Sequence, residues 1–176
     1  MIVREIKKYN FRLRHVRLSD ARVFFESEQD KEAKRNFMRT PKNIKEVEKD
    51  IKEDILQYKN KKPSSEKFTI EVDGKCAGWI KINQLNMSFF EHKAKIDFCL
   101  HPDYRGKGIM TNAVKEVVDY AFKKYKLKRL EAWTRTSNKV VSSLNKKLGF
   151  KLEGVLRKNK CKDGEYLDDM VWAIVR

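Results

Sequence analysis

Two glycines and two basic residues form the segment of this sequence that is best suited to bind a phosphate group. They follow one another as Arg105-Gly106-Lys107-Gly108, directly before an amphipathic stretch. The first N–H groups of a helix have no partner within it, and the helix dipole adds partial positive charge there. Because glycine has no Cβ, the backbone at Gly106 and Gly108 can fold closely around phosphate oxygens. The spacing matches neither a nucleotide P-loop nor a dinucleotide fingerprint, so a different phosphate-bearing ligand is expected.

A second polar pattern lies further along the chain, from Asn138 to Phe150. It reads N-K-V-V-S-S-L-N-K-K-L-G-F. The pattern predicts a helix that ends at Gly149, because glycine readily adopts the left-handed conformation that follows many helices.

Together the two segments resemble the two signatures of the GNAT superfamily of acetyltransferases. The first, [Q/R]-x-x-G-x-[G/A], is matched from Arg105 to Met110, although Met110 replaces the usual small residue. The second, N-x-x-[A/S]-x-x-x-[Y/L]-x-K-x-G-F, is matched at Asn138, Lys147, Gly149 and Phe150. The larger Met110, the E-G-x-x-R sequence at 153–157 and Asp168 after Gly164 are similar to the ribosomal-protein N-terminal acetyltransferase (RimJ/RimL-like) branch. The resemblance covers most of the chain.

The resemblance implies an α/β fold and a co-substrate. The expected architecture is a mixed, mostly antiparallel twisted sheet of six or seven strands, with one central splayed parallel pair and about four flanking helices, in a single domain over residues 1–176. Acetyl-CoA is the implied co-substrate, without a metal. The acetyl-CoA-binding residues implied by the resemblance are Phe98, Cys99, Leu100, Arg105, Gly106, Lys107, Gly108, Ile109, Met110, Thr111, Asn138 and Asn145.

The implied reaction transfers acetyl to a primary amine that must first be neutral. An α-amine has a pKa of about 8 and a lysine about 10.4, so an N-terminal acceptor needs less help from a base. Asp97 is the first candidate for the base, through water, because it neighbours the strand expected to hold pantetheine. Glu71 and Glu131 are alternatives, and a simple solvent-facing carboxylate is the other interpretation of Asp97.

The acid that would protonate the leaving thiolate is missing from its usual place. Many relatives have a tyrosine where this chain has Asn145, and Rim-like relatives have a serine where it has Val141. Asn145 and the neighbouring Ser142 are candidates for polarising the thiolate, with an ordinary polar helix face as the alternative. A thiol with a pKa of about 8.5 also leaves unaided, so turnover does not require the acid.

Three functions remain open at this stage. The first is acetylation of a protein N-terminal α-amine, such as that of a ribosomal protein. The second is acetylation of a small amine, such as an amino sugar, an antibiotic or an amino acid metabolite. The third is a catalytically weak CoA-binding module that associates with RNA or ribosomes, which the missing tyrosine keeps open.

Composition narrows the partners and the compartment. With 41 Lys and Arg against 25 Asp and Glu, the chain carries a net charge of +16. This charge fits a ribosome or another polyanion as partner, and a generally solvated surface fits it equally well. No long apolar run or signal core occurs, so we expect a cytoplasmic protein that does not contact membranes. We expect it to be a monomer or a homodimer. Three scattered cysteines indicate reduced thiols and no metal site.

Hydrophobic periodicity supplies the elements that must position these residues. Asp73-Gly74 and Asp163-Gly164 predict hairpin turns, and the stretch Glu26–Arg39 predicts a loop or a short helix. The expected helices are one capped by Ser19, one starting at Thr40-Pro41 and ending at Tyr58, Met110–Tyr125 and Asn138–Leu148. The expected strands are Phe11–Val16, Phe68–Val72, Cys76–Leu85, Ala94–Leu100, Arg129–Thr134, Phe150–Leu156 and Tyr166–Val175.

Overall fold

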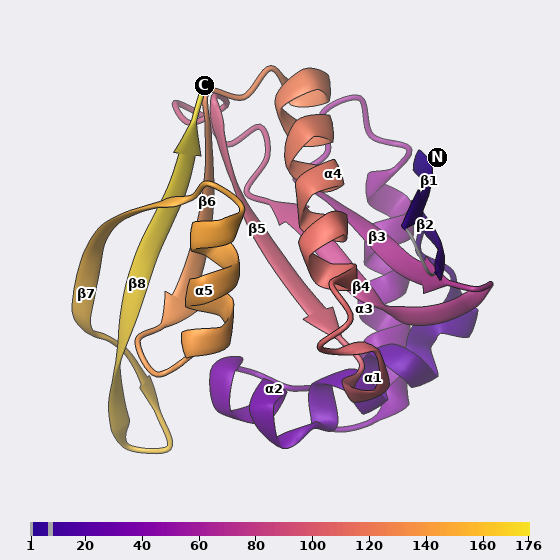
Figure 1. Cartoon of the computed structure of the whole chain (residues 1–176), viewed down its shortest axis with the longest axis horizontal. Coiled ribbons are helices and arrows are strands. Elements are labelled where there is room, and N and C mark those ends of the chain that lie inside the picture. The colour runs from indigo at the N-terminus through magenta and orange to yellow at the C-terminus, as the bar shows by residue number, and fades with distance from the viewer. Residues whose placement is uncertain (1, 7–8) are drawn as a thin grey trace.

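A twisted sheet runs through the whole molecule in the computed structural model, which describes residues 2–6 and 9–176 (Figure 1). Its eight strands follow the order β1-β2-β3-β4-β5-β6-β8-β7. All neighbours are antiparallel except β5 and β6, which are parallel. The strands are β1 (Ile2–Ile6), β2 (Tyr9–His15), β3 (Ser65–Val72), β4 (Lys75–Asn83), β5 (Lys93–Leu100), β6 (Arg129–Arg135), β7 (Lys151–Lys162) and β8 (Glu165–Val175).

The predicted fold class is confirmed, with one strand added at an edge. All seven expected strands are present, and β1 pairs with β2 outside them. Both predicted hairpin turns occur, at Asp73-Gly74 and Asp163-Gly164, with positive φ at each central residue. That geometry is the one in which a two-residue turn matches the twist of its strands.

Five α-helices occur in the described part of the chain, one more than expected. The addition is α2, which lies in the stretch where a loop or a short helix was predicted. Its cap is Asp30, whose Oδ2 accepts a hydrogen bond from the Glu32 N–H. The helix expected from Thr40-Pro41 begins later, after Asn43, which caps it through the Glu46 N–H. The helices are α1 (Ala21–Gln29), α2 (Lys31–Asn36), α3 (Ile44–Gln57), α4 (Ile109–Tyr125) and α5 (Lys139–Lys147).

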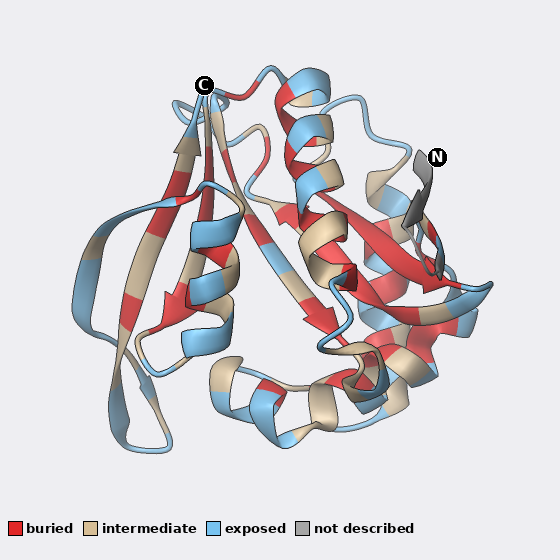
Figure 2. Cartoon of the chain, viewed as in Figure 1, coloured by how far each residue is buried: buried red, intermediate tan, exposed pale blue. Residues whose placement is uncertain are grey.

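The helices cover the two faces of the sheet unequally. Helix α4 buries an apolar stripe on one face, where Val114, Val117 and Ala121 pack against β3 to β6. Figure 2 shows this stripe turned toward the sheet and the polar side of α4 turned to solvent. Helices α1 and α3 pack on the other face through Phe24 and Ile51. In the described residues, no helix is both long enough and apolar enough to span a bilayer.

Candidate active site

The parallel strands β5 and β6 separate soon after they start. They pair at only three positions, from Lys93 with Arg129 to Lys95 with Glu131. Beyond these positions β5 stays paired with β4 up to Leu100, while β6 follows β8 in another direction, as Figure 1 shows. The last part of β5 therefore has no ladder partner on β6. A backbone edge of this kind can pair with the amide groups of a ligand.

A cavity of about 540 Å³ lies at the open end of this splay. Its volume falls in the range typical of small-molecule sites. The end of β5, the start of α4, one side of α2 and one side of α5 contribute its walls. The lining residues are Glu32, Ala33, Asn36, Phe37, Phe98, Cys99, Leu100, Tyr104, Arg105, Gly106, Gly108, Ile109, Met110, Thr111, Asn138, Val140, Val141, Ser143, Leu144 and Lys147.

The glycine loop adopts the conformation that its sequence predicted. Gly106 has φ of 73° and Gly108 has φ of 74°, and both lie in the left-handed region that glycine tolerates. The first backbone bond of α4 runs from the Asn112 N–H to the Gly108 carbonyl. The N–H groups before it have no partner within the helix. These groups lie at the wall of the cavity, where they can bind an anion.

The two basic residues of the loop have different positions. Arg105 lines the cavity, but its Nε donates to the Leu100 carbonyl at 3.0 Å and its guanidinium pairs with Asp30 at 2.7 Å. It therefore connects the loop to the cap of α2. Lys107 is exposed, lies outside the lining and donates to the Asp103 carbonyl at 2.6 Å. Backbone N–H groups, and not these side chains, supply most of the anion-binding capacity here.

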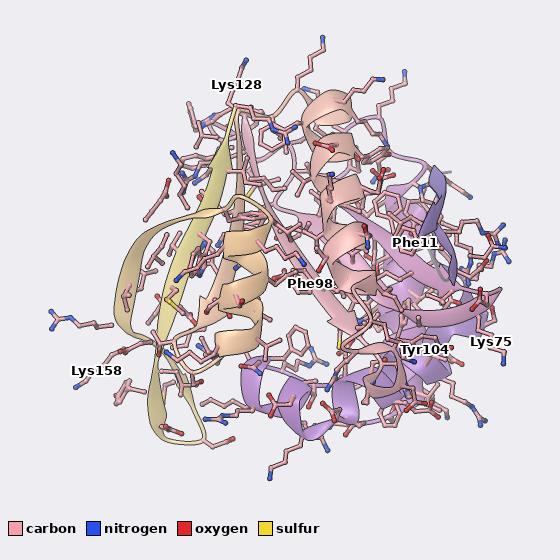
Figure 3. The ribbon with its side chains drawn as sticks, in the orientation of Figure 1. Phe11, Lys75, Phe98, Tyr104, Lys128 and Lys158 are labelled. Atoms are coloured by element: carbon pink, nitrogen blue, oxygen red, sulfur yellow. The ribbon has the colours of Figure 1, made fainter. Side chains whose placement is uncertain are left out.

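All the other predicted acetyl-CoA residues except Asn145 line the cavity. Phe98, Cys99 and Leu100 line the cavity, and Figure 3 places Phe98 between α4 and α5. Burial raises the pKa of the Cys99 thiol to about 12, so it stays protonated and is a poor nucleophile. Asn138 also lines the cavity and caps α5 by accepting a hydrogen bond from the Val141 N–H.

Ser142 and Asn145 are on the side of α5 that faces away from the cavity. Neither is among its lining residues. The Ser142 hydroxyl donates to the Asn138 carbonyl at 2.9 Å. Asn145 is fully buried, and within the described chain neither its Nδ2 nor its Oδ1 has a hydrogen-bond partner. The structure thus does not bring these two residues together with the loop.

Asp97 points to the opposite face of β5 from Phe98 and is not among the residues that line the cavity. It stands two residues beyond Lys95, the last position at which β5 pairs with β6. Its carboxylate accepts a hydrogen bond from Asn83. Desolvation by the surrounding protein raises the pKa of Asp97 above the usual value of a carboxyl, although part of its side chain is exposed to solvent. The Asn83 hydrogen bond and the positive charge of Lys95 offset this only in part. A raised pKa suits a general base.

The two alternative bases, Glu71 and Glu131, are each paired with arginine side chains. Glu71 pairs with Arg12 and with Arg14, and the pKa of Glu71 is lowered because these bonds outweigh the effect of burial. Glu131 accepts from Arg129 and from the Trp133 indole, and its pKa is lowered in the same way. Both carboxylates are therefore poorer proton acceptors than Asp97. In the described part of the chain, no group of His, Cys, Asp and Glu side chains is arranged to hold a metal.

A second cavity, of about 750 Å³, lies between α2 and the β7–β8 hairpin. Helix α2 separates the two cavities, since Ala33 faces the first and Lys34 the second. The Lys162 Nζ donates to the Phe37 carbonyl at 2.7 Å and so holds the β7–β8 hairpin against α2. The lining residues are Lys34, Arg35, Thr40, Arg135, Thr136, Ser137, Lys162, Asp163, Glu165, Tyr166, Leu167 and Asp168.

Comparison with known proteins gives consistent matches in sequence and structure. Residues 10–151 match the family model described as Acetyltransferase (GNAT) domain. Probable N-acetyltransferase YjcK of Bacillus subtilis is 34% identical over 125 residues, which cover 69% of this chain and 68% of that protein. Spermidine N(1)-acetyltransferase of Escherichia coli is 31% identical over 103 residues, which cover 58% of this chain and 54% of that protein.

Solved structures of low identity share the fold. The RimL ribosomal L7/L12 alpha-N-protein acetyltransferase in complex with coenzyme A superimposes with a TM-score of 0.83 at 17% identity, over 99% of this chain and 98% of that one. The microcin C7 self-immunity acetyltransferase MccE, in complex with acetyl-CoA and AMP, gives 0.82 at 23% identity, over 94% and 92%.

Proposed function

The chain belongs to the GNAT acetyltransferase family, and on that premise we propose that it transfers the acetyl group of acetyl-CoA to a free α-amine at a protein N-terminus. The observation that carries the proposal is the cavity at the splay of β5 and β6, closed by the glycine loop at the start of α4. The loop supplies N–H groups for the diphosphate, and the free edge of β5 supplies backbone groups for the pantetheine amides.

Different residues of this chain bind the co-substrate, orient the thioester and accept the proton. Acetyl-CoA supplies the activated acetyl group. The N–H groups from Gly106 to Thr111 hold its diphosphate, and the β5 backbone from Phe98 to Leu100 orients the thioester. Asp97 accepts, through water, the proton that the amine loses as its nitrogen bonds to the acetyl carbon and the carbon–sulfur bond breaks. The thiolate then takes a proton from solvent, because its pKa of about 8.5 makes it an adequate leaving group.

The second cavity supports an acceptor larger than a simple metabolite. It adjoins the acetyl-CoA cavity at the start of α5, where Ser137 lines the second cavity and Asn138 the first, and the β7–β8 hairpin forms its far wall. An extended peptide end is the shape that fits between a helix and a hairpin. A free α-amine is also the acceptor that needs least from a lone carboxylate base, since roughly a tenth of it is neutral at pH 7.

A small amine is the second candidate acceptor. Three carboxylates at the hairpin, those of Asp163, Glu165 and Asp168, line the second cavity and can pair with a cationic amine. Four basic residues, Lys34, Arg35, Arg135 and Lys162, line the same cavity. The spermidine acetyltransferase among the relatives fits this reading. The net charge of +16 opposes it, because the field of the whole protein repels polycations.

A peptide panel tests the proposed acceptor. We expect coenzyme A release, measured with a thiol reagent, when acetyl-CoA is mixed with peptides that have a free N-terminus. We expect none with the same peptides blocked at the N-terminus but carrying lysine, and mass spectrometry should place the acetyl group on the α-amine. Faster turnover of spermidine or of free amino acids than of every peptide would instead select the small-amine function.

The role of Asp97 is tested by Asp97→Asn, which keeps the shape of the side chain and removes the base. We expect kcat/KM at pH 7 to fall by about 10²–10³-fold, within the range of general-base contributions, with acetyl-CoA affinity unchanged. Because the raised pKa means that Asp97 takes up a proton at higher pH than usual, wild-type activity should decline as the pH falls through it. The variant should lack this decline.

The matched control is Glu53→Gln, which also converts an acid to its amide but lies exposed on α3. It should leave kcat/KM and the pH profile unchanged. An Asp97→Asn enzyme with wild-type kcat/KM would exclude Asp97 as the base and leave the amine to lose its proton directly to solvent.

A further inference from the structure

Three segments meet at the end of the molecule where α4 finishes, far from the glycine loop where α4 begins (Figure 1). Two are loops, and the third is the last turn of α4 with the residues that follow it. They are residues 59–63, 86–93 and 123–128, and we call them the basic cap. Hydrogen bonds join them to one another. The Asn86 side chain donates to the Pro63 carbonyl at 2.8 Å, and the Lys128 N–H donates to the His92 carbonyl at 2.7 Å. The cap is thus a single continuous surface.

The charge of the cap is strongly one-sided. Its three segments contain eight lysines and one acidic residue, Glu91. Seven of the eight lysines are exposed, and Figure 3 shows Lys128 extending into solvent at this end. The lysines are Lys59, Lys61, Lys62, Lys93, Lys123, Lys124, Lys126 and Lys128. Lysines clustered in this way bind a polyanion more tightly than the same number of lysines dispersed over the surface.

Aromatic side chains project from the middle of the cap. Phe89 is 87% exposed and has φ of 63°, which is unusual for a residue with a bulky side chain. Phe90 and Met87 beside it are also exposed, and the Lys93 Nζ lies 4.5 Å from the centre of the Phe90 ring. A flat ring surrounded by cations can stack on an unpaired base while the cations contact phosphates.

A polar hollow of about 350 Å³ adjoins the same loops. Its lining includes Asn60, Asn86, Lys126 and His15, whose ring stacks on Tyr58 with centroids 3.8 Å apart. Glu66 also lines it, with its carboxylate paired to Lys124. A nucleotide offers this hollow a phosphate, base edges and a 2′-hydroxyl, which amides and an imidazole can bind. A lipid headgroup also offers phosphate and hydroxyls, but it has no base edge for the amides and no flat ring to stack on Phe89. The hollow and Phe89 together therefore favour RNA over an anionic membrane.

We propose that the basic cap binds single-stranded RNA, with phosphates on its lysines and an unstacked base against Phe89. This site is separate from the acetyl-CoA cavity and does not depend on the identity of the acceptor. Bound there, an RNA leaves the mouth of the acetyl-CoA cavity uncovered, because the two lie at opposite ends of α4.

Fluorescence anisotropy with a short labelled oligouridylate, titrated at several salt concentrations, measures the binding. The test variant is Lys61→Glu/Lys62→Glu/Lys128→Glu. Its control is Lys42→Glu/Lys45→Glu/Lys49→Glu, which makes the same charge change at exposed positions before and along α3. We expect the cap variant to lose at least about tenfold in affinity and its salt slope to fall by about 2, at roughly 0.7 per lost contact. The control should lose less than about threefold.

The aromatic contact is tested by Phe89→Ser, with Leu152→Ser as the control at an exposed apolar position on β7. Phe89→Ser should lose at least about fivefold in RNA affinity without a change in salt slope, because stacking releases no counterions. Leu152→Ser should have no effect. Acetyl-CoA affinity, measured by calorimetry, should be the same in all four variants and reports that each is folded.

Four results would overturn the proposal. Absence of binding by the wild-type protein removes it directly. Equal losses in the two triple variants mean that overall charge, and not the cap, binds the RNA. Equal affinity for a single-stranded DNA of the same length would remove the assignment to RNA. Binding to anionic vesicles that the cap variant abolishes, with no binding to the oligonucleotide, assigns the cap to a membrane.

Discussion

Alanine in place of Gly78 is expected to weaken acetyl-CoA binding by at least about tenfold, although the residue itself is not in the cavity. Gly78 lies on β4 opposite Leu100. A Cβ built on Gly78 would lie 2.3 Å from the Cys99 carbonyl oxygen and 2.9 Å from the Leu100 Cα. These are backbone atoms, so no rotamer change relieves the clash. The end of β5 must move, and that end is a wall of the cavity.

Two measurements check this prediction. Calorimetry gives the loss in acetyl-CoA affinity. Urea denaturation should show a free energy of unfolding that is about 3 kcal/mol lower than in the wild type, the upper end of the usual cost of overpacking. The matched control is Gly74→Ala in the β3–β4 turn, which also has positive φ but has open space around its Cβ position. It should lose roughly 1–2 kcal/mol from backbone strain alone and bind acetyl-CoA normally. Wild-type affinity in Gly78→Ala would mean that the end of β5 does not shape the site.

The sequence predicted the parts of the site that depend on local backbone geometry. The glycines of the loop, the helix that follows them and the alternating strands before and after are each readable from a few neighbouring residues. The splay itself was implied by the family resemblance and is present between β5 and β6. Local pattern and tertiary structure agree in these elements because each of them is stabilised mainly by its own backbone and one buried face.

Contacts between distant segments could not be predicted in this way. Arg105 reads as an anion ligand in the loop, yet it pairs with Asp30, which is 75 positions away. No local pattern encodes such a partner. Helix α2 has only six residues, too few to display a period, and yet it separates the two cavities.

Helix α5 shows why hydrophobic periodicity assigns the wrong buried side to a helix that lines a binding cavity. Its apolar residues Val140, Val141 and Leu144 line the acetyl-CoA cavity, and Val140 is 80% exposed. Its polar residues Ser142 and Asn145 are buried. A helix that lines a binding cavity keeps apolar residues accessible to the ligand, so the usual rule that the apolar face packs inward assigns its two sides in reverse.

A large stability effect is also expected at Glu66, a buried carboxylate far from the acetyl-CoA cavity. It accepts hydrogen bonds from Tyr120 and Lys124 at 3.0 Å and from Tyr125 at 2.5 Å, and its Oε1 lies 3.0 Å from the His15 Nε2. These bonds join β3 to the last turns of α4 and the end of β2. Burial alone would raise the pKa of Glu66, but the bonds from Tyr125 and Lys124 outweigh it and hold the pKa below its usual value.

Glu66→Gln should therefore lower the free energy of unfolding by about 1.5–3 kcal/mol at pH 7, the usual contribution of hydrogen bonds to a charged group. The loss stays in this range because Lys124 and His15, which remain, are partly exposed and can be solvated. Because the pKa of Glu66 is depressed in the folded state, its contribution is complete above the unfolded pKa of about 4.3 and is lost as the pH falls through the folded value. The difference between wild type and variant in urea denaturation should thus shrink steadily in acid. Glu26→Gln, at an exposed position on α1, should change stability by less than about 0.5 kcal/mol at either pH. A difference for Glu66→Gln that stays constant into strong acid would mean that the lost packing around the side chain, and not its charge, causes the destabilisation.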